Sequence, residues 1–246
     1  MDYTVSEWNG FERRDFKYED HDALVVLPKT SNSRWMMKME YFGAFPNLEI
    51  ELLRRGWTLA YIKNDSRWGV DSDSHRKARF ADYLSGKFSL EKRFTCVGMS
   101  CGGICSVNFA SRHPDYVGCL YLDAPVMNML SCPMGFGVGN PLSADSSTWQ
   151  EIVNAYGFDR SSLLSYREHP IDRLPILAEH KLPAAIIYGD SDPIVPYVEN
   201  GAIMEKYWRE AGLPLFVAGK KDCGHHPHGL EDPTPLADFI EANALR

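Results

Sequence analysis

The chain has 246 residues, a net charge of −7 and 44% hydrophobic residues, a composition typical of one soluble globular unit with a sizeable core. Lys and Arg form no basic stripe and no apolar run reaches the length of a membrane span, so we expect neither nucleic acid nor a membrane as a partner. Because residues 1–17 lack the apolar segment of a secretory signal, and the six cysteines show no Cys-x-x-Cys spacing, we expect a cytoplasmic protein without a structural zinc site.

Predicted strands alternate with predicted helices from residue 22 to the end of the chain. In chain order, the strand patterns cover residues 22–28, 35–42, 57–62, 94–97, 116–123, 184–190 and 214–218. The helical patterns cover residues 46–55, 72–84, 103–113, 149–156, 161–166, 199–211 and 235–244. This alternation predicts one α/β domain over residues 1–246, with a mainly parallel, doubly wound sheet flanked by helices.

One long segment interrupts the alternation. About 60 residues separate Asp123 from Ala184, far more than a simple strand–helix–strand crossover needs. The segment leaves the carboxyl edge of the predicted sheet, where α/β proteins bind their ligands. We therefore expect residues 126–182 to form a small cap over a pocket. The alternative is an insertion without a functional role.

The sequence Gly98-Met99-Ser100-Cys101-Gly102 lies between a predicted strand and a predicted helix. This is the setting of a strand–turn–helix in which a serine hydroxyl is held exposed at a sharp turn. We expect Cβ atoms at Gly98 and Gly102 to clash with the neighbouring strand and helix, which explains both glycines. Ser100 is therefore the predicted nucleophile.

A serine nucleophile needs a base, and the base needs an orienting acid that precedes it in the chain. Asp192 follows a predicted buried strand in a turn that Pro193 stiffens, and it is the predicted acid. Asp190 is an alternative in the same turn, although a turn aspartate often bonds its own backbone. Asp123 ends the strand that follows Ser100 and is a second alternative.

The predicted base lies in a histidine-rich loop between the last strand and the last helix. His225 directly follows Gly224 and is the first choice, with His226 and His228 as alternatives. A rival interpretation is a metal site made by Asp222 and these histidines. Neighbouring side chains on an extended loop point apart, so we expect no metal ion there and no cofactor elsewhere.

The reaction also needs hydrogen-bond donors aimed at the developing oxyanion. The backbone N–H of Cys101 is the first candidate, because it follows the nucleophile at the start of a helix. The second candidate is the N–H of Ala44, in the loop after the strand predicted for residues 35–42.

Several apolar or aromatic side chains are predicted to face the nucleophile from the cap or from this loop. An apolar lining with few polar groups suits a small acyl or aromatic substrate. The alternative is that most of these side chains pack the cap onto the body. The candidates for the substrate pocket are Phe42, Phe45, Met127, Trp149 and His226.

Together these motifs resemble the α/β-hydrolase superfamily over residues 22–240. The segments that match its nucleophile, acid and base are residues 98–103, 189–196 and 224–225. The resemblance therefore implies an α/β-hydrolase fold with Ser100, Asp192 and His225 in those three roles.

The resemblance has one departure, because many members carry His-Gly where this chain has Phe42-Gly43. This leaves the register of the second oxyanion donor open. Residues 40–46 and 224–230 look more narrowly like a group of bacterial hydrolases of uncertain substrate. Some of those relatives are linked with deacetylation of carbohydrates, which implies an acetyl ester as one candidate substrate.

The pattern as a whole predicts a serine hydrolase that cleaves a carboxylic ester of a small molecule through an acyl-enzyme. The same catalytic groups could cleave an amide, a thioester or a carbon–carbon bond, because the cap and pocket set the leaving group. A ligand-binding protein that kept only the fold is a third hypothesis, and the intact set of motifs disfavours it. Assembly into a homo-oligomer is compatible with the sequence.

Overall fold

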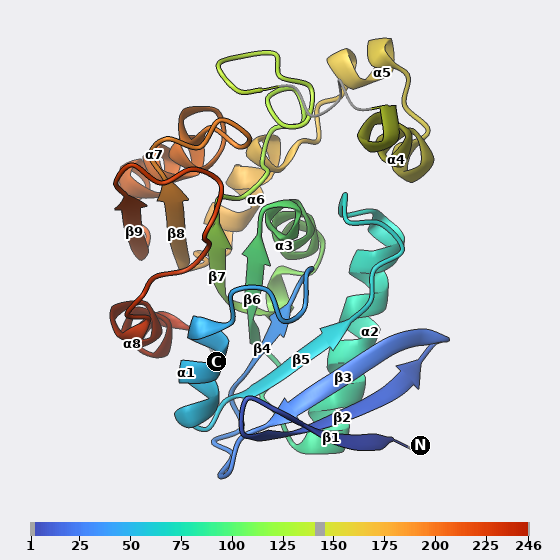
Figure 1. Cartoon of the computed structure of the whole chain (residues 1–246), viewed down its shortest axis with the longest axis vertical. Helices are drawn as coiled ribbons and strands as arrows, with labels where there is room; N and C mark the ends of the chain where they lie inside the picture. Colours follow the sequence, from blue (N-terminus) through green and yellow to red (C-terminus); the bar gives the residue numbers. More distant parts are fainter. Residues whose placement is uncertain (1–2, 141–145, 246) are drawn as a thin grey trace.

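The computed structural model of the chain describes residues 3–140 and 146–245 (Figure 1). Within them, one 9-stranded sheet has the strand order β1-β2-β3-β5-β4-β6-β7-β8-β9. The strands are β1 (Thr4–Trp8), β2 (Phe11–Tyr18), β3 (His21–Leu27), β4 (Trp35–Lys38), β5 (Thr58–Ile62), β6 (Phe94–Met99), β7 (Val117–Asp123), β8 (Ala184–Gly189) and β9 (Leu215–Lys220). The pairs from β5 to β9 are parallel, and those from β1 to β5 are antiparallel. The predicted mainly parallel sheet is confirmed.

Helices cover both faces of this sheet (Figure 1). They are α1 (Asn47–Arg54), α2 (Asp71–Phe88), α3 (Cys101–Arg112), α4 (Ser146–Tyr156), α5 (Arg160–Ser165), α6 (Leu174–Glu179), α7 (Gly201–Glu210) and α8 (Thr234–Asn243), with short turns η1 (Pro114–Tyr116), η3 (Pro170–Arg173) and η4 (Tyr197–Glu199). Side chains of α1 and α8 fill one apolar cluster, and those of α2, α3, α6 and α7 fill another. Burial on both faces is what a doubly wound sheet requires. None of the helices in the described ranges combines the length and apolar character that crossing a bilayer demands.

Two strands at the start of the chain are not predicted by the hydrophobic pattern. β1 and β2 form an antiparallel hairpin at the edge of the sheet. Its turn is Asn9-Gly10, with φ of 51° and 82°. Asn-Gly with two positive φ angles is the strongest short hairpin signal, so the turn predicts these strands better than their side chains do. The polar character of β1 follows from its exposed place at the edge.

The segment predicted as a cap consists of two differently placed parts. α4 and α5 extend beyond the carboxyl ends of the strands (Figure 1), where Ile152 and Leu163 join an apolar cluster with Trp68. α6 instead packs against α3 and α7 in the body of the molecule. Residues 141–145 of the segment lie outside the described residues. The overhang is therefore shorter than residues 126–182, and its action as a cap stays a prediction.

A buried ion pair fastens the carboxyl edge of the sheet to α1. Lys38 ends β4, and its Nζ lies 2.5 Å from Oε1 of Glu49, with both side chains at most 2% exposed. The same Nζ donates to the carbonyl oxygen of Ala44 at 3.1 Å. Lys38 thus joins β4, α1 and the loop that follows β4. The second oxygen of Glu49, Oε2, has no hydrogen-bond partner among the described residues.

We expect Lys38→Met to lower the free energy of unfolding by about 3–5 kcal/mol, because it leaves the Glu49 carboxylate buried without its partner. The double variant Lys38→Met/Glu49→Leu should recover most of this loss, since apolar residues of similar volume often replace a buried ion pair without net cost. Urea denaturation of the three proteins measures both effects. Equal stability of the single and double variants would contradict the argument.

Candidate active site

Ser100 lies in the turn between β6 and α3, in a backbone conformation that few residues adopt. Its φ is 52° and its ψ is −119°. Three backbone hydrogen bonds hold it there: its N–H donates to Asp123 O at 2.9 Å, and its carbonyl accepts from Gly103 N and Val126 N at 2.9 and 3.0 Å. A conformation of this kind persists only where the surroundings impose it, and such strain clusters at functional sites.

Two glycines near this turn, Gly98 and Gly103, lie too close to neighbouring atoms to carry a Cβ. A Cβ at Gly98 would lie 2.3 Å from Ser106 Oγ, so the prediction for this glycine is confirmed. A Cβ at Gly102 would meet nothing closer than Glu40 Cβ at 3.6 Å, so the prediction of a clash there is wrong. The tight contact comes one residue later, because a Cβ at Gly103 would lie 2.4 Å from Pro125 Cβ, in the segment that follows β7.

The three residues predicted as nucleophile, base and acid lie in one hydrogen-bonded row. His225 Nε2 is 3.0 Å from Ser100 Oγ, and His225 Nδ1 is 2.7 Å from Asp192 Oδ2. The other oxygen of Asp192 accepts from the N–H groups of Ile194 and Val195 at 2.8 and 2.9 Å. Burial alone would raise the pKa of Asp192, but the hydrogen bonds from His225 and from these amides outweigh it and hold the pKa below its ordinary value.

The alternative acids have other partners. Asp190 is exposed and accepts a hydrogen bond from Ser191 Oγ at 2.9 Å. Asp123 is fully buried at the end of β7, and its Oδ1 lies 2.8 Å from His228 Nδ1. Its Oδ2 accepts from Gly229 N at 2.5 Å and from Tyr121 Oη at 3.1 Å. Asp123 therefore forms a second Asp–His pair beside the first, a pairing that the sequence patterns do not predict.

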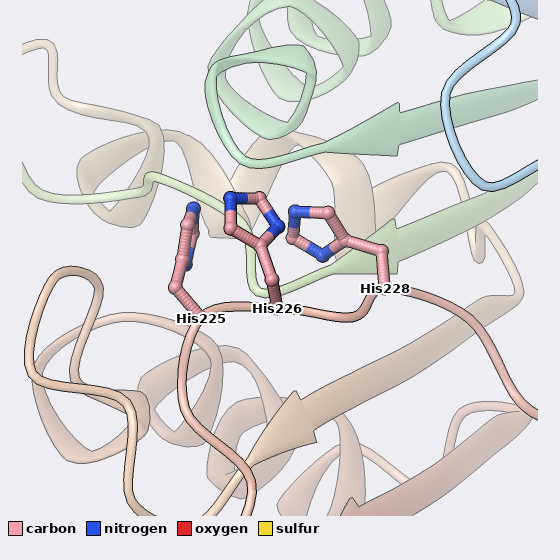
Figure 2. A group of neighbouring side chains, drawn as sticks. All are labelled: His225, His226 and His228. Atoms are coloured by element: carbon pink, nitrogen blue, oxygen red, sulfur yellow. The ribbon is translucent and has the colours of Figure 1, made fainter.

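The imidazoles of His225, His226 and His228 lie side by side (Figure 2), with one ring nitrogen of each within 4.8 Å of the others. This differs from the expectation that neighbouring side chains of the loop point apart. The loop bends instead of running extended, and Phe45 packs against two of the rings, stacked on His226 at 5.6 Å and edge-on to His228 at 5.3 Å. Partial burial, and then the neighbouring imidazoles, hold the pKa of His226 below its ordinary value.

One of the two predicted oxyanion donors is already engaged. The N–H of Ala44 donates to Tyr41 O at 3.0 Å and closes a turn, which corrects its assignment as the second donor. The N–H of Cys101 opens α3, and a first-turn amide has no acceptor within its own helix. It is therefore available next to Ser100.

A cavity of about 400 Å³ opens onto Ser100. Its lining residues are Tyr41, Ala44, Phe45, Arg67, Trp68, Met99, Ser100, Cys101, Cys132, Ile194, His225, His226 and His228. Larger hollows of about 600 and 610 Å³ lie elsewhere, but neither is lined by any of these residues. The chemistry of the lining, not the volume, identifies this cavity as the candidate site.

Two of the five predicted pocket residues, Phe45 and His226, line this cavity and the other three do not. Phe42 packs against Trp8 and Tyr61 at 5.4 and 5.5 Å, because β4 ends at Lys38 and the chain turns before it. Met127 is fully buried in the core. Trp149 packs against the apolar cluster under α4 and α5, as the alternative interpretation holds.

Sequence reasoning missed Arg67 and Trp68, which line the cavity after β5. Both bind Glu151 of α4: Arg67 Nε and Nη2 donate at 2.6 and 3.0 Å, and Trp68 Nε1 donates at 2.9 Å. The missed signal is positional, because residues that follow a parallel strand lie at the ligand-binding edge of the sheet.

No family model and no curated protein matches this sequence. Among solved structures, it is similar to Porphyromonas gingivalis dipeptidyl peptidase 4 (17% identity, TM-score 0.66, covering 96% of this chain and 36% of that one). It is also similar to Pyrococcus horikoshii acylaminoacyl peptidase (13% identity, TM-score 0.67, covering 95% of this chain and 42% of that one). A third similar structure is an S-formylglutathione hydrolase from Agrobacterium tumefaciens (13% identity, TM-score 0.61, covering 98% of this chain and 96% of that one). The chain thus spans 36% and 42% of the two peptidases. These likenesses confirm that the chain has the α/β-hydrolase fold.

We expect Gly103→Ala to lower the free energy of unfolding by about 1–3 kcal/mol, because the added methyl group meets Pro125 and forces the turn after β7 to move. Gly102→Ala is the matched control one residue away. It should be neutral or stabilise by up to about 1 kcal/mol, since alanine favours the helix and meets only ordinary contacts. Urea denaturation compares the two variants, and equal losses would refute the assignment of the close contact.

Proposed function

We propose that this chain, an α/β-hydrolase by fold, is a serine hydrolase that cleaves a carboxylic ester of a small molecule. The observation that carries the proposal is the hydrogen-bonded row from Asp192 through His225 to Ser100, with distances of 2.7 and 3.0 Å. Those lengths are within the reach that proton transfer between a nucleophile and its base requires. The row opens onto a cavity of about 400 Å³, which suits a small substrate.

The tautomer of His225 sets the direction of the reaction. The Asp192 carboxylate can only accept, so Nδ1 of His225 carries the proton and Nε2 offers its lone pair to the Ser100 hydroxyl. Oγ attacks the ester carbonyl as Nε2 takes its proton. The imidazolium, stabilised by Asp192, then returns the proton to the leaving alcohol. Water attacks the acyl-enzyme by the same route and releases the acid.

The oxyanion needs donors on the opposite side of the reacting carbon from His225. The N–H of Cys101 supplies the first, with the positive end of the α3 dipole behind it. We assign the second to the hydroxyl of Tyr41, which lines the cavity in the loop where the amide of Ala44 is already engaged. Burial, and then the Cys101 thiol, raise the pKa of Tyr41, so its hydroxyl keeps the proton it would donate.

An ester is less demanding than an amide or a carbon–carbon bond, because its alcohol leaves more readily than an amine or a carbanion. The similar structures include two peptidases and one S-formylglutathione hydrolase, so the likeness of fold by itself favours neither an ester nor an amide. A panel of substrates should therefore include an amide, a thioester and a compound with a cleavable carbon–carbon bond, beside short acyl esters, aryl esters and acetylated sugars. Variants with Asn or Ala in place of the three catalytic residues serve as the inactive controls for every substrate in this panel.

We expect Ser100→Ala to abolish labelling by a fluorophosphonate probe and to lower kcat on short p-nitrophenyl esters at least about 10³-fold. Asp192→Asn should lower kcat by about 10⁴-fold, since the amide favours the wrong tautomer of His225. Asp190→Asn is the matched control in the same turn and should keep the rate of the wild type. Wild-type turnover by Ser100→Ala would end the proposal.

We expect Tyr41→Phe to lower kcat by about 10²–10³-fold with little change in KM, because it removes one donor to the transition state and none to the ground state. Tyr61→Phe is the control. Tyr61 is another partly buried tyrosine whose side chain does not line the cavity, so its loss should leave kcat unchanged. Steady-state kinetics on an aryl ester separate the two. A wild-type kcat in Tyr41→Phe would assign the second donor elsewhere.

A further inference from the structure

Two of the cavity histidines are oriented by buried carboxylates. His225 Nδ1 lies 2.7 Å from Asp192 and His228 Nδ1 lies 2.8 Å from Asp123. Each carboxylate is an acceptor, so each ring carries its proton on Nδ1 and has its lone pair on Nε2, which in His225 faces the Ser100 hydroxyl. A carboxylate–histidine unit of this kind is the usual support of a metal-ligating histidine. The serine chemistry requires one such unit, and the cavity contains two.

The ring of His226 completes a nearly equilateral triangle with the other two (Figure 2), with centroids 4.8 Å from His225 and 4.9 Å from His228, which themselves lie 5.0 Å apart. The ring is exposed, and one of its nitrogens belongs to the group of three possible ligand atoms. Phe45 stacks on the ring at 5.6 Å and limits its rotation. The three imidazoles thus combine two supported ligands with a third that is held in place by packing.

We propose that His225, His226 and His228 form a binding site for a divalent transition-metal ion of the zinc class, and that an ion bound there silences Ser100. Three neutral imidazoles are a common ligand set for Zn²⁺ and a poor one for Mg²⁺ or Ca²⁺. The two buried aspartates behind the rings supply the negative charge that offsets the ion.

The spacing of the rings is close to what a tetrahedral ion needs. Their ligand atoms lie within 4.8 Å of one another, and zinc–nitrogen bonds of about 2.0 Å place tetrahedral ligands about 3.3 Å apart. To close that difference the rings must turn inward about χ1 and χ2, against the hold of Phe45 and of the two carboxylates. Because His225 Nε2 is the atom that faces Ser100 Oγ at 3.0 Å, the ion and the serine compete for one lone pair. The silencing step rests on the proposed function, whereas the binding of the ion does not.

The test uses the metal-free 246-residue chain. Calorimetry with ZnCl₂ should give one site per chain, and MgCl₂ should give none. Labelling of Ser100 by the fluorophosphonate probe should fall in step with zinc occupancy and return on addition of EDTA. Asp123→Asn, which removes the support of His228, should weaken zinc binding by about 10–100-fold. His226→Gln and His228→Gln should weaken it as well, and Ser100→Ala should still bind.

The matched control is His75→Gln. His75 Nδ1 lies 3.0 Å from His113 Nε2 in an exposed histidine pair away from the cavity, so removing it should leave zinc affinity, stoichiometry and hydrolysis unchanged. Zinc affinity at the wild-type value in both His226→Gln and His228→Gln would overturn the site. Bound zinc that leaves probe labelling unchanged, or that speeds hydrolysis, would overturn the silencing. Absence of labelling in metal-free protein would instead count against the proposed function, while calorimetry would still decide the metal site.

Discussion

The hydrogen bond between Asp192 and His225 is the interaction on which the site depends. It fixes the tautomer of the imidazole, its rotation and the atom that it presents to Ser100. Asp192 can orient His225 because two backbone amides hold its other oxygen, so the carboxylate is fixed before the histidine binds it. These amides also keep the buried acid ionised, which a desolvated carboxyl would otherwise resist. The strained turn at Ser100 supplies the other end of the row.

The loop after β4 depends on a second set of buried polar groups. Lys38 Nζ donates to the carbonyl oxygen of Ala44 in this loop. Asn64 Nδ2 donates to Met39 O at 2.7 Å and to Glu40 Oε2 at 2.5 Å. Buried networks of this kind specify one arrangement, because each unpaired group would cost desolvation free energy. This rigidity explains why the loop can present aromatic side chains to the cavity at fixed positions. The same loop carries the ring that packs against the histidines.

The two Asp–His pairs differ in what lies beyond them, and that difference decides their chemistry. His225 reaches a serine hydroxyl, whereas the ring of His228, among the described residues, hydrogen-bonds only Asp123 and lines the cavity wall. An imidazole oriented by a carboxylate is a good base for a proton and a good ligand for an ion by the same electronic effect. The same proximity therefore underlies both proposals, hydrolysis at Ser100 and metal binding by the three imidazoles. In these proposals, the ion and the Ser100 hydroxyl compete for the Nε2 atom of His225.

The sequence by itself determined the local features: the alternation of strands and helices, the sharp turn at Ser100 and the chain order of serine, acid and histidine. These depend on short-range backbone preferences, which a window of a few residues records. The Asn9-Gly10 turn is also a local signal and predicts a hairpin. The polar strands on either side of it lack the hydrophobic pattern that would identify them as strands.

Only the tertiary structure decided which carboxylate serves which histidine and which side chains line the cavity. Ser100 and His225 are 125 residues apart, and Asp123 and His228 are 105 apart. Contacts at that range depend on how segments cross in space. Phe42 shows this, because β4 ends at Lys38 and the chain then turns the Phe42 ring toward Trp8 and Tyr61 and not toward the cavity. The convergence of three imidazoles follows from the bend of their loop over Phe45. No periodicity in the sequence encodes that bend.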